Sequence, residues 1–138
     1  MPRRGIEHHL DVIREADVRE ALEMDAYYAE SFGPEEAAAS LDRALALAPL
    51  DVRLLRALCG RLARIDDPAR LQEALRAWID ADPENWEPCA RMGDLHRSRG
   101  NLPLARRAYE GAIERLPPPR ERKRMEGILA DLPSDPGR

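Results

Sequence analysis

Apolar residues recur at intervals of three and four along most of the chain, the spacing that places side chains on one face of an α-helix. Two successive runs between residues 50 and 82 show it most clearly, with Leu54, Leu55, Leu58, Leu62 and Ile65 in the first and Leu71, Leu75, Trp78 and Ile79 in the second. No run alternates between apolar and polar residues, as a half-buried strand does. The pattern therefore predicts an all-α protein.

Three prolines divide this helical pattern at a constant interval. Pro49, Pro83 and Pro117 are 34 residues apart, and each follows a helical run of about 15 residues that it cannot continue. Between these prolines the helices come in pairs. Each pair is broken by a turn or capping sequence, at Gly33-Pro34, Asp67-Pro68 and Gly100-Asn101. The chain therefore consists of helix-turn-helix units with a period of 34 residues.

A unit of two helices closed by a proline resembles the tetratricopeptide repeat. The third unit carries the resemblance best, since it places typed residues at the expected offsets: Met92-Gly93, His96 where an aromatic residue is usual, Ala105, Tyr109, Ala112 and Pro117. A glycine inside a helix costs about 1 kcal/mol relative to alanine. We therefore expect the small residues Gly93, Ala105 and Ala112 to be points of close contact between helices.

The other two units match the repeat less completely. The first keeps Ala37, Leu41, Ala44 and Pro49, and the second keeps Leu58, Cys59 and Pro83. In the first unit either Asp25 or Ala26 occupies the glycine place, and only the register with Asp25 keeps Met24 and Tyr28 in position. In the second unit Trp78 and Leu71 stand where alanine is usual, so we expect Trp78 to alter the packing against a neighbouring helix or to sit in a widened gap.

The resemblance implies an α-solenoid, a right-handed superhelix with a C-terminal capping helix. Its predicted parts are an N-terminal helical segment (1–17), three repeats (18–51, 52–85 and 86–119), a capping helix (120–132) and a flexible tail (133–138). The cap sets Gly127 in the glycine place of a fourth first helix, and it would cover the stacking face of the last repeat. No glycine or proline separates the N-terminal segment from the first repeat, so it is either a separate helix or an extension of the first one.

Composition and charge narrow the possible partners. The net charge is −4, from 22 basic and 26 acidic residues, which excludes a general nucleic-acid binder. The basic residues 120–124 are then the solvated side of the capping helix. Lys123 is the only lysine, and this strong arginine bias indicates a GC-rich bacterial genome. The sequence shows neither a signal peptide nor an apolar run that could span a membrane, so we expect a cytoplasmic protein that binds no membrane.

Candidate chemistry is sparse, and we expect neither an enzyme nor a cofactor. Cys59 and Cys89 lack metal or redox spacing and are expected to be buried thiols. The adjacent His8 and His9 point about 100° apart on a helix, and His8 with Asp11 gives too few ligands for a closed metal site. His96 falls at a packing position. The chain shows no nucleophile motif and no glycine-rich phosphate loop.

A binding surface is implied by the resemblance, in which the first helix of each pair lines a concave face. The inward positions hold Arg53, Arg56, Gly60, Ala63 and Arg64 in the second unit, Glu87, Ala90, Asp94, Arg97 and Ser98 in the third, and Arg124 and Ile128 in the cap. Because guanidinium groups form paired hydrogen bonds with carboxylates, an acidic or C-terminal peptide is the expected ligand. The predicted groove residues are Arg53, Arg56, Arg64, Arg91, Arg97 and Arg124.

Some relatives bind chaperone C-termini through a clamp of Lys, Asn, Asn, Lys and Arg. The matching positions here hold Leu22, Ala26, Ala57, Glu87 and Arg91. Only Arg91 fits, and Glu87 would repel the ligand, so we reject that mode. The prediction is a non-catalytic adaptor or scaffold that binds a protein or peptide segment. The alternatives are a small export or secretion chaperone that binds a secreted substrate, and a self-assembling protein that uses Trp78, Trp86 and the N-terminal helix.

Overall fold

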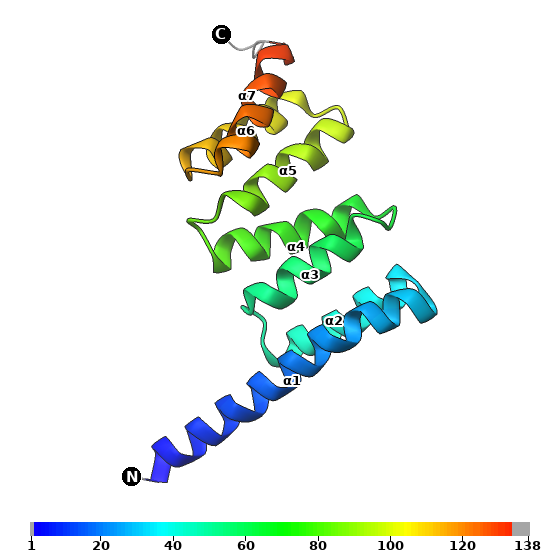
Figure 1. Ribbon diagram of the computed structural model, residues 1–138, viewed down its shortest axis with the longest axis vertical. Helices are drawn as coiled ribbons and strands as arrows, with labels where there is room; N and C mark the ends of the chain where they lie inside the picture. Colours follow the sequence, from blue (N-terminus) through cyan, green and yellow to red (C-terminus); the bar gives the residue numbers. More distant parts are fainter. Residues whose placement is uncertain (1, 134–138) are drawn as a thin grey trace. The chain divides into compact units, whose positions relative to one another are not determined.

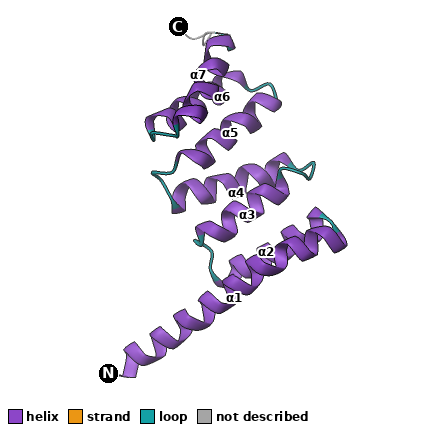
Figure 2. Cartoon of the chain, in the orientation of Figure 1, coloured by secondary structure: helices purple, strands orange, loops and turns teal. Residues whose placement is uncertain are grey.

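A computed structural model describes the backbone of residues 2–133 and the side chains of residues 15–133. The described residues form seven α-helices and no strand, which confirms the all-α prediction (Figure 2). The helices are α1 (Pro2–Phe32), α2 (Pro34–Leu47), α3 (Val52–Leu62), α4 (Pro68–Ala81), α5 (Trp86–Ser98), α6 (Leu102–Glu114) and α7 (Pro119–Asp131). Residues 134–138 of the predicted tail, and the side chains of His8, His9 and Asp11, lie outside this description.

The 34-residue period is visible in the positions where helices begin. The second helices of the pairs, α2, α4 and α6, begin at residues 34, 68 and 102, and the first helices α3 and α5 begin at residues 52 and 86. Within α4 the chain divides into two compact units, unit 1 (residues 1–74) and unit 2 (residues 75–138).

Short polar side chains explain where several helices start. Asp51 accepts hydrogen bonds from the backbone amides of Arg53 and Leu54, and Asn85 accepts one from the amide of Glu87. These caps satisfy amides that the first helical turn leaves without partners. The Asp67 carboxylate accepts a hydrogen bond from the amide of residue 70 in the same way, as the Asp67-Pro68 sequence predicts.

One helix is shorter than its apolar pattern indicates. The pattern continues to Ile65, but α3 ends at Leu62. The amides of Arg64 and Ile65 donate to the carbonyls of Arg61 and Leu62, three residues back, so the last turn tightens out of α-helical geometry. Arg64, a predicted groove residue, therefore lies in the turn after α3.

Unit 1 is built on α1, which runs without a break from residue 2 to residue 32. This resolves the open question about the N-terminal segment, because residues 2–17 are continuous with the first repeat helix. Helix α1 packs beside α2 and also contacts α3, and its first half extends beyond the end of α2 (Figure 1). Buried side chains of this unit include Val18, Ala37, Ala38, Leu41, Leu54, Leu55, Leu58, Cys59 and Leu62.

The burial of α1 side chains distinguishes the two registers of the first repeat. Ala26 is exposed, whereas Met24, Asp25 and Tyr28 are half-buried. This agrees with the register that puts Asp25 in the glycine place. The Asp25 carboxylate at this position is paired with the guanidinium of Arg61 on α3, since it accepts hydrogen bonds of 3.0 Å and 2.8 Å from Nε and Nη2 of Arg61.

Unit 2 is centred on Tyr109, which is completely buried. Its apolar cluster is formed by α5, α6 and α7, with the buried members Cys89, Ala90, Ala105, Tyr109, Ala112 and Met125. Gly93 lies directly against the Tyr109 ring, because a Cβ atom at residue 93 would stand 2.7 Å from two ring carbons. Ala105 and Ala112 are fully buried as well. The small residues are therefore points of close contact, as the repeat pattern predicts.

Two further positions in unit 2 show how the repeat is modified. Trp78 is completely buried at its alanine place, and the guanidinium of Arg91 lies 5.3 Å from the centre of its ring. A Cβ atom added at Gly127 would meet nothing within 4 Å, since no helix follows α7 among the described residues. The space beside Gly127, at the position where the repeat pattern has a glycine, is therefore not filled by another described helix.

Candidate functional site

At the start of α3, Arg53 is held by the chain's own carboxylates. Arg53 donates two hydrogen bonds to Glu15 on α1, at 2.7 Å and 2.9 Å, and one of 2.8 Å to Asp51. Hydrogen bonding to both carboxylates raises the pKa of Arg53, while the same bonds lower the pKa values of Glu15 and Asp51. About half of the Arg53 side chain is exposed, so this pair ties α1 to α3 at the protein surface.

The other two predicted groove arginines of the second repeat, Arg56 and Arg64, are exposed but do not lie on the same helix. Arg56 lies one turn after Arg53 on α3, whereas Arg64 lies in the turn beyond the end of that helix. The structure therefore does not give the second repeat a continuous row of three helical arginines. Arg53 and Arg56 share the start of the helix, and Arg64 stands apart at its far end.

On α5, the guanidinium of Arg91 interacts with two neighbouring side chains. It forms an ion pair of 2.7 Å with Glu87, one turn earlier on the same helix, and its guanidinium lies over the buried Trp78 ring. Arg91 is the one residue that fits the chaperone-type clamp. Its pairing with Glu87 gives a second reason to reject that mode.

The polar cluster at Asp94 brings α5, α6 and α7 together. The Tyr109 hydroxyl donates a hydrogen bond of 2.5 Å to Oδ1 of Asp94, and Arg124 donates one of 3.3 Å to the same oxygen. Arg124 also donates to Glu121 at 3.0 Å. Burial raises the pKa of Tyr109, and the hydrogen bond to Asp94 raises it further, so the phenol stays a donor at neutral pH.

Arg97 and Arg124 both lie close enough to the Tyr109 hydroxyl for their charges to act on it. Burial of Arg124 acts to lower its pKa, but the hydrogen bonds to Glu121 and Asp94 outweigh this, and its pKa lies above the ordinary value. Arg97 is exposed and forms no ion pair with another described residue. Around Asp94 the cluster therefore has the guanidinium of Arg124, which is paired, and that of Arg97, which has no paired carboxylate among the described residues.

The remaining sequence candidates have packing roles. Cys59 and Cys89 are buried and form no disulfide among the described residues, and burial raises the pKa of Cys89, which keeps it in the unreactive thiol form. His96 is buried, and its Nδ1 atom has no hydrogen-bond partner among the described residues. No set of three or more metal-ligating side chains gathers within residues 15–133.

A shallow hollow of about 490 Å³ lies between the turn after α4 and the end of α6. Pro83, Glu84, Glu114, Arg115 and Leu116 line it. Arg115 donates hydrogen bonds to the backbone carbonyls of Pro83 and Gly111, both at 2.7 Å, so its guanidinium is bound to the backbone on both sides of the hollow. The other charged side chains of the lining are the carboxylates Glu84 and Glu114.

Sequence reasoning missed three features of the surface. The pairing of Arg53 with Glu15 could not be found, because these residues are far apart in the chain and only the fold brings α1 to α3. The hydrogen bond between Tyr109 and Asp94 was also missed, because the repeat pattern assigns a separate position to each residue and does not indicate that they meet. The third feature is a group of aromatic side chains near the end of α1. The three aromatic residues within positions 27–32 of the sequence could have indicated it.

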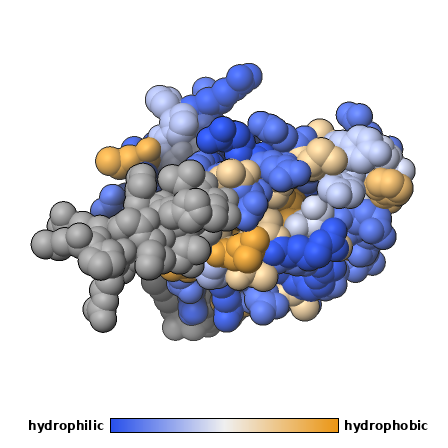
Figure 3. Space-filling model, turned by 90° about the horizontal axis from the view of Figure 1, so that it is seen from below, coloured by the Kyte–Doolittle hydropathy of each residue, from blue (hydrophilic) through white to orange (hydrophobic). Residues whose placement is uncertain are grey.

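On the face seen in Figure 3, the atoms that are not grey are mostly blue or pale, with separate orange hydrophobic areas. Within the part of the chain that the structure describes, every helix is too short or too polar to cross a membrane.

Comparison with known proteins finds its matches among solved structures. No protein-family model matches the chain, and no curated protein matches it either. The crystal structure of MamA is similar with a TM-score of 0.71 and 21% sequence identity, over 88% of this chain and 73% of that one. The first TPR of Spaghetti (RPAP3), bound to HSP90 peptide SRMEEVD, is similar with a TM-score of 0.68 and 16% identity, over 84% of this chain and 95% of that one. With seven helices in its described part and a 34-residue period, the chain therefore has the helical-repeat fold of tetratricopeptide repeat proteins.

Proposed function

We propose that this chain is a non-catalytic protein–protein interaction module, and that unit 2 binds an acidic segment of a partner protein on the surface formed by α5 and α7. One structural neighbour is bound to a peptide, SRMEEVD, with three acidic side chains. Fold alone does not choose a ligand. The proposal therefore rests on the side chains of this chain.

The observation that carries it is the distribution of charge around Asp94. Oδ1 of Asp94 accepts hydrogen bonds from both Tyr109 and Arg124, so its negative charge is shared between them. Arg97, close to the same hydroxyl, has no carboxylate of its own among the described residues. A ligand carboxylate placed there would receive charge-assisted hydrogen bonds without displacing an existing pair.

The wider charge of unit 2 supports the same ligand. Residues 97–124 contain nine basic and three acidic side chains, in a chain that is acidic as a whole. A local basic excess attracts acidic segments and speeds their association at low salt. Arg53 contributes less to such a surface than its sequence position indicates, because Glu15 and Asp51 already neutralise it.

Affinity capture with the full chain tests the proposal. Wild type and Arg97→Glu are used as bait in lysate from the native organism, and the captured proteins are quantified by mass spectrometry. We expect a defined set of proteins with acidic segments that Arg97→Glu loses. Arg43→Glu is the matched control, since Arg43 is an exposed arginine of α2 in unit 1 and its reversal changes the net charge equally. Equal capture by wild type and Arg97→Glu, with unchanged circular dichroism, would contradict the proposal.

A further inference from the structure

We propose that unit 1 carries a second docking surface of opposite character, an aromatic patch bordered by carboxylates that binds an arginine- or lysine-bearing segment of a partner protein. The patch consists of Tyr27, Tyr28 and Phe32, near the C-terminal end of α1. It lies outside the α5–α7 surface and would take a ligand of the opposite charge, so it goes beyond the function proposed above.

The three rings of the patch contact one another. The ring centres of Tyr27 and Tyr28 are 5.8 Å apart, those of Tyr27 and Phe32 are 6.2 Å apart, and those of Tyr28 and Phe32 are 6.1 Å apart. Yet Tyr27 is 52% exposed and Phe32 is 60% exposed. Half of the six aromatic residues of the chain are thus gathered in one place, two of them largely in solvent. Clustered exposed aromatic rings are typical of protein-binding surfaces.

The stretch of sequence that contains the patch carries only negative side-chain charges, some of which are paired with arginines from α3 and α4. Between Arg19 and Arg43 the sequence has no basic residue, and it has seven carboxylates: Glu20, Glu23, Asp25, Glu30, Glu35, Glu36 and Asp42. Two of these, Asp25 and Asp42, form short ion pairs with Arg61 and Arg70 of unit 1. Glu20, Glu23 and Glu36 form no ion pair with another described residue, so their charges are available to a partner.

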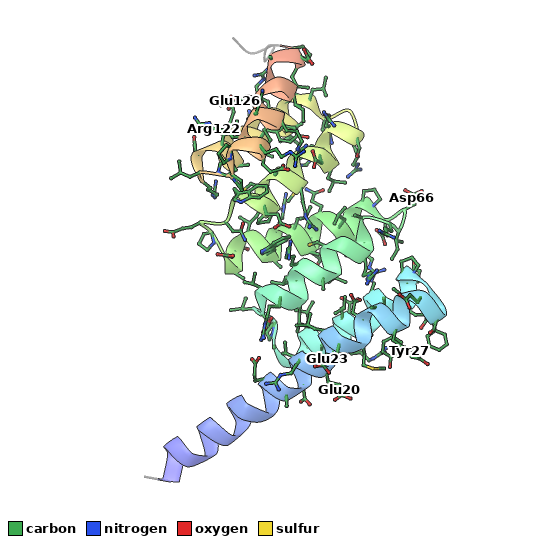
Figure 4. The ribbon with its side chains drawn as sticks, in the orientation of Figure 1. Glu20, Glu23, Tyr27, Asp66, Arg122 and Glu126 are labelled. Carbon is green, nitrogen blue, oxygen red and sulfur yellow. The ribbon has the colours of Figure 1, made fainter. Side chains whose placement is uncertain are left out.

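The carboxylates and the rings lie close enough to act on one ligand. Glu20, Glu23 and Tyr27 are spaced three and four residues apart, which puts them along one face of α1, and Figure 4 shows them following one another on that helix. A cationic side chain placed over a ring of the patch is therefore within reach of a carboxylate one helical turn away.

The occupant that fits this surface is a basic protein segment. Guanidinium and ammonium groups bind the faces of aromatic rings and also pair with carboxylates, so one ligand side chain satisfies both features. The chain shows this chemistry in its own interior, where Arg91 pairs with Glu87 and lies over Trp78. Nucleic acids, anionic lipids and acidic peptides would all be repelled by the uncompensated carboxylates.

Peptide binding to the full chain tests this inference. The probe is a fluorescein-labelled peptide of three Gly-Arg-Leu-Arg repeats, compared with the same peptide carrying Glu in place of Arg, and binding is followed by fluorescence anisotropy. We expect the basic peptide to bind and the double variant Tyr27→Ala/Phe32→Ala to weaken it by about tenfold. The variant Glu20→Gln/Glu23→Gln should weaken it by several-fold, and raising the salt from about 0.05 to about 0.5 M should do the same.

Matched controls separate the patch from general attraction to an acidic protein. Leu50→Ala truncates an apolar side chain of unit 1 that is 70% exposed, and Glu73→Gln removes an exposed carboxylate on α4. Both should leave the affinity unchanged. Equal affinity for wild type and the aromatic double variant would overturn the inference. It would also be overturned if light scattering showed that the chain self-associates and that the double variant abolishes this, since the occupant would then be a second copy.

The proposed surface of unit 2 and the aromatic patch of unit 1 can be refuted independently of each other. Tyr27→Ala/Phe32→Ala leaves Arg97 and Arg124 unchanged, so any binding of acidic segments by unit 2 should persist in that variant. Conversely, Arg97→Glu should leave binding of the basic peptide intact. Loss of both activities in either variant, with helical content preserved, would show that the two surfaces are not independent.

Discussion

The close approach of α5 to α6 at Gly93 makes a sharp prediction about stability. Replacing a helical glycine by alanine ordinarily stabilises a helix by about 1 kcal/mol. At Gly93 the new Cβ would stand 2.7 Å from two Tyr109 ring carbons and 2.9 Å from a third. Carbon atoms in favourable contact are about 3.5–4.0 Å apart. The ring cannot easily retreat, because it is completely buried and Asp94 holds its hydroxyl.

The expected magnitude follows from these opposing effects. Overpacking of a filled core costs about 1–3 kcal/mol. After the gain in helix propensity is subtracted, Gly93→Ala should destabilise the protein by up to about 2 kcal/mol. Gly127→Ala provides the control, since it makes the same chemical change inside α7, where the added Cβ meets nothing within 4 Å. That variant should stabilise the protein by about 0.5–1 kcal/mol.

The assay is unfolding of the full chain by urea and by heat, followed by circular dichroism. The two alanine variants should differ by about 1–3 kcal/mol, with Gly93→Ala having the lower melting temperature. In the sequence, the positions 34 residues before Gly93 and Tyr109 hold Cys59 and Leu75, a larger residue in the glycine place and a smaller one in the tyrosine place. Gly93→Ala should accordingly be milder in a Tyr109→Leu background. A rise in melting temperature equal to that of Gly127→Ala would refute the reasoning.

Three further predictions concern individual side chains. Asp25→Asn should cost about 1–3 kcal/mol in urea unfolding, because it removes the charge partner of the largely buried Arg61 guanidinium; an unchanged midpoint would contradict a role for this pair. Burial lowers the pKa of His96 from 6.5, so protonation favours the unfolded chain: stability should be full above about pH 6.5 and should fall as the pH drops from there toward the folded-state pKa. His96→Phe should flatten that part of the profile of unfolding free energy against pH, and an identical slope in the variant would count against it. Glu15→Gln should leave the urea unfolding midpoint nearly unchanged despite its two hydrogen bonds with Arg53, since the pair is half exposed; a clear drop of the midpoint in the same assay would show that the pair anchors α1.

The sequence predicted the features that depend on local chemistry. Helix starts follow from capping residues such as Asp51 and Asn85, and the 34-residue period follows from prolines that end helices. The contact at Gly93 was predictable because a helical glycine is costly unless something fills its place. The early end of α3 was not predicted because the apolar pattern continues to Ile65, although Gly60 in its last turn is a weak helix former.

The candidate site was less predictable because it depends on which charges the fold brings together. The repeat pattern places Arg53 and Arg97 at comparable inward positions, but of these two only Arg53 has carboxylates of described residues within hydrogen-bond distance. That difference comes from Glu15, 38 residues earlier in the chain. Likewise, the pattern counts Tyr28 as a packing residue and says nothing of its contacts with Tyr27 and Phe32.

The central claim is that the two units bear docking surfaces of opposite charge. The most direct test is a nuclear magnetic resonance titration of the isotope-labelled full chain with the basic peptide and, separately, with its glutamate counterpart. We predict that the basic peptide shifts the backbone signals around Tyr27 and Phe32, and that the acidic peptide shifts those around Arg97 and Arg124. The same signals responding to both peptides, or neither peptide producing a localised response, would contradict the account.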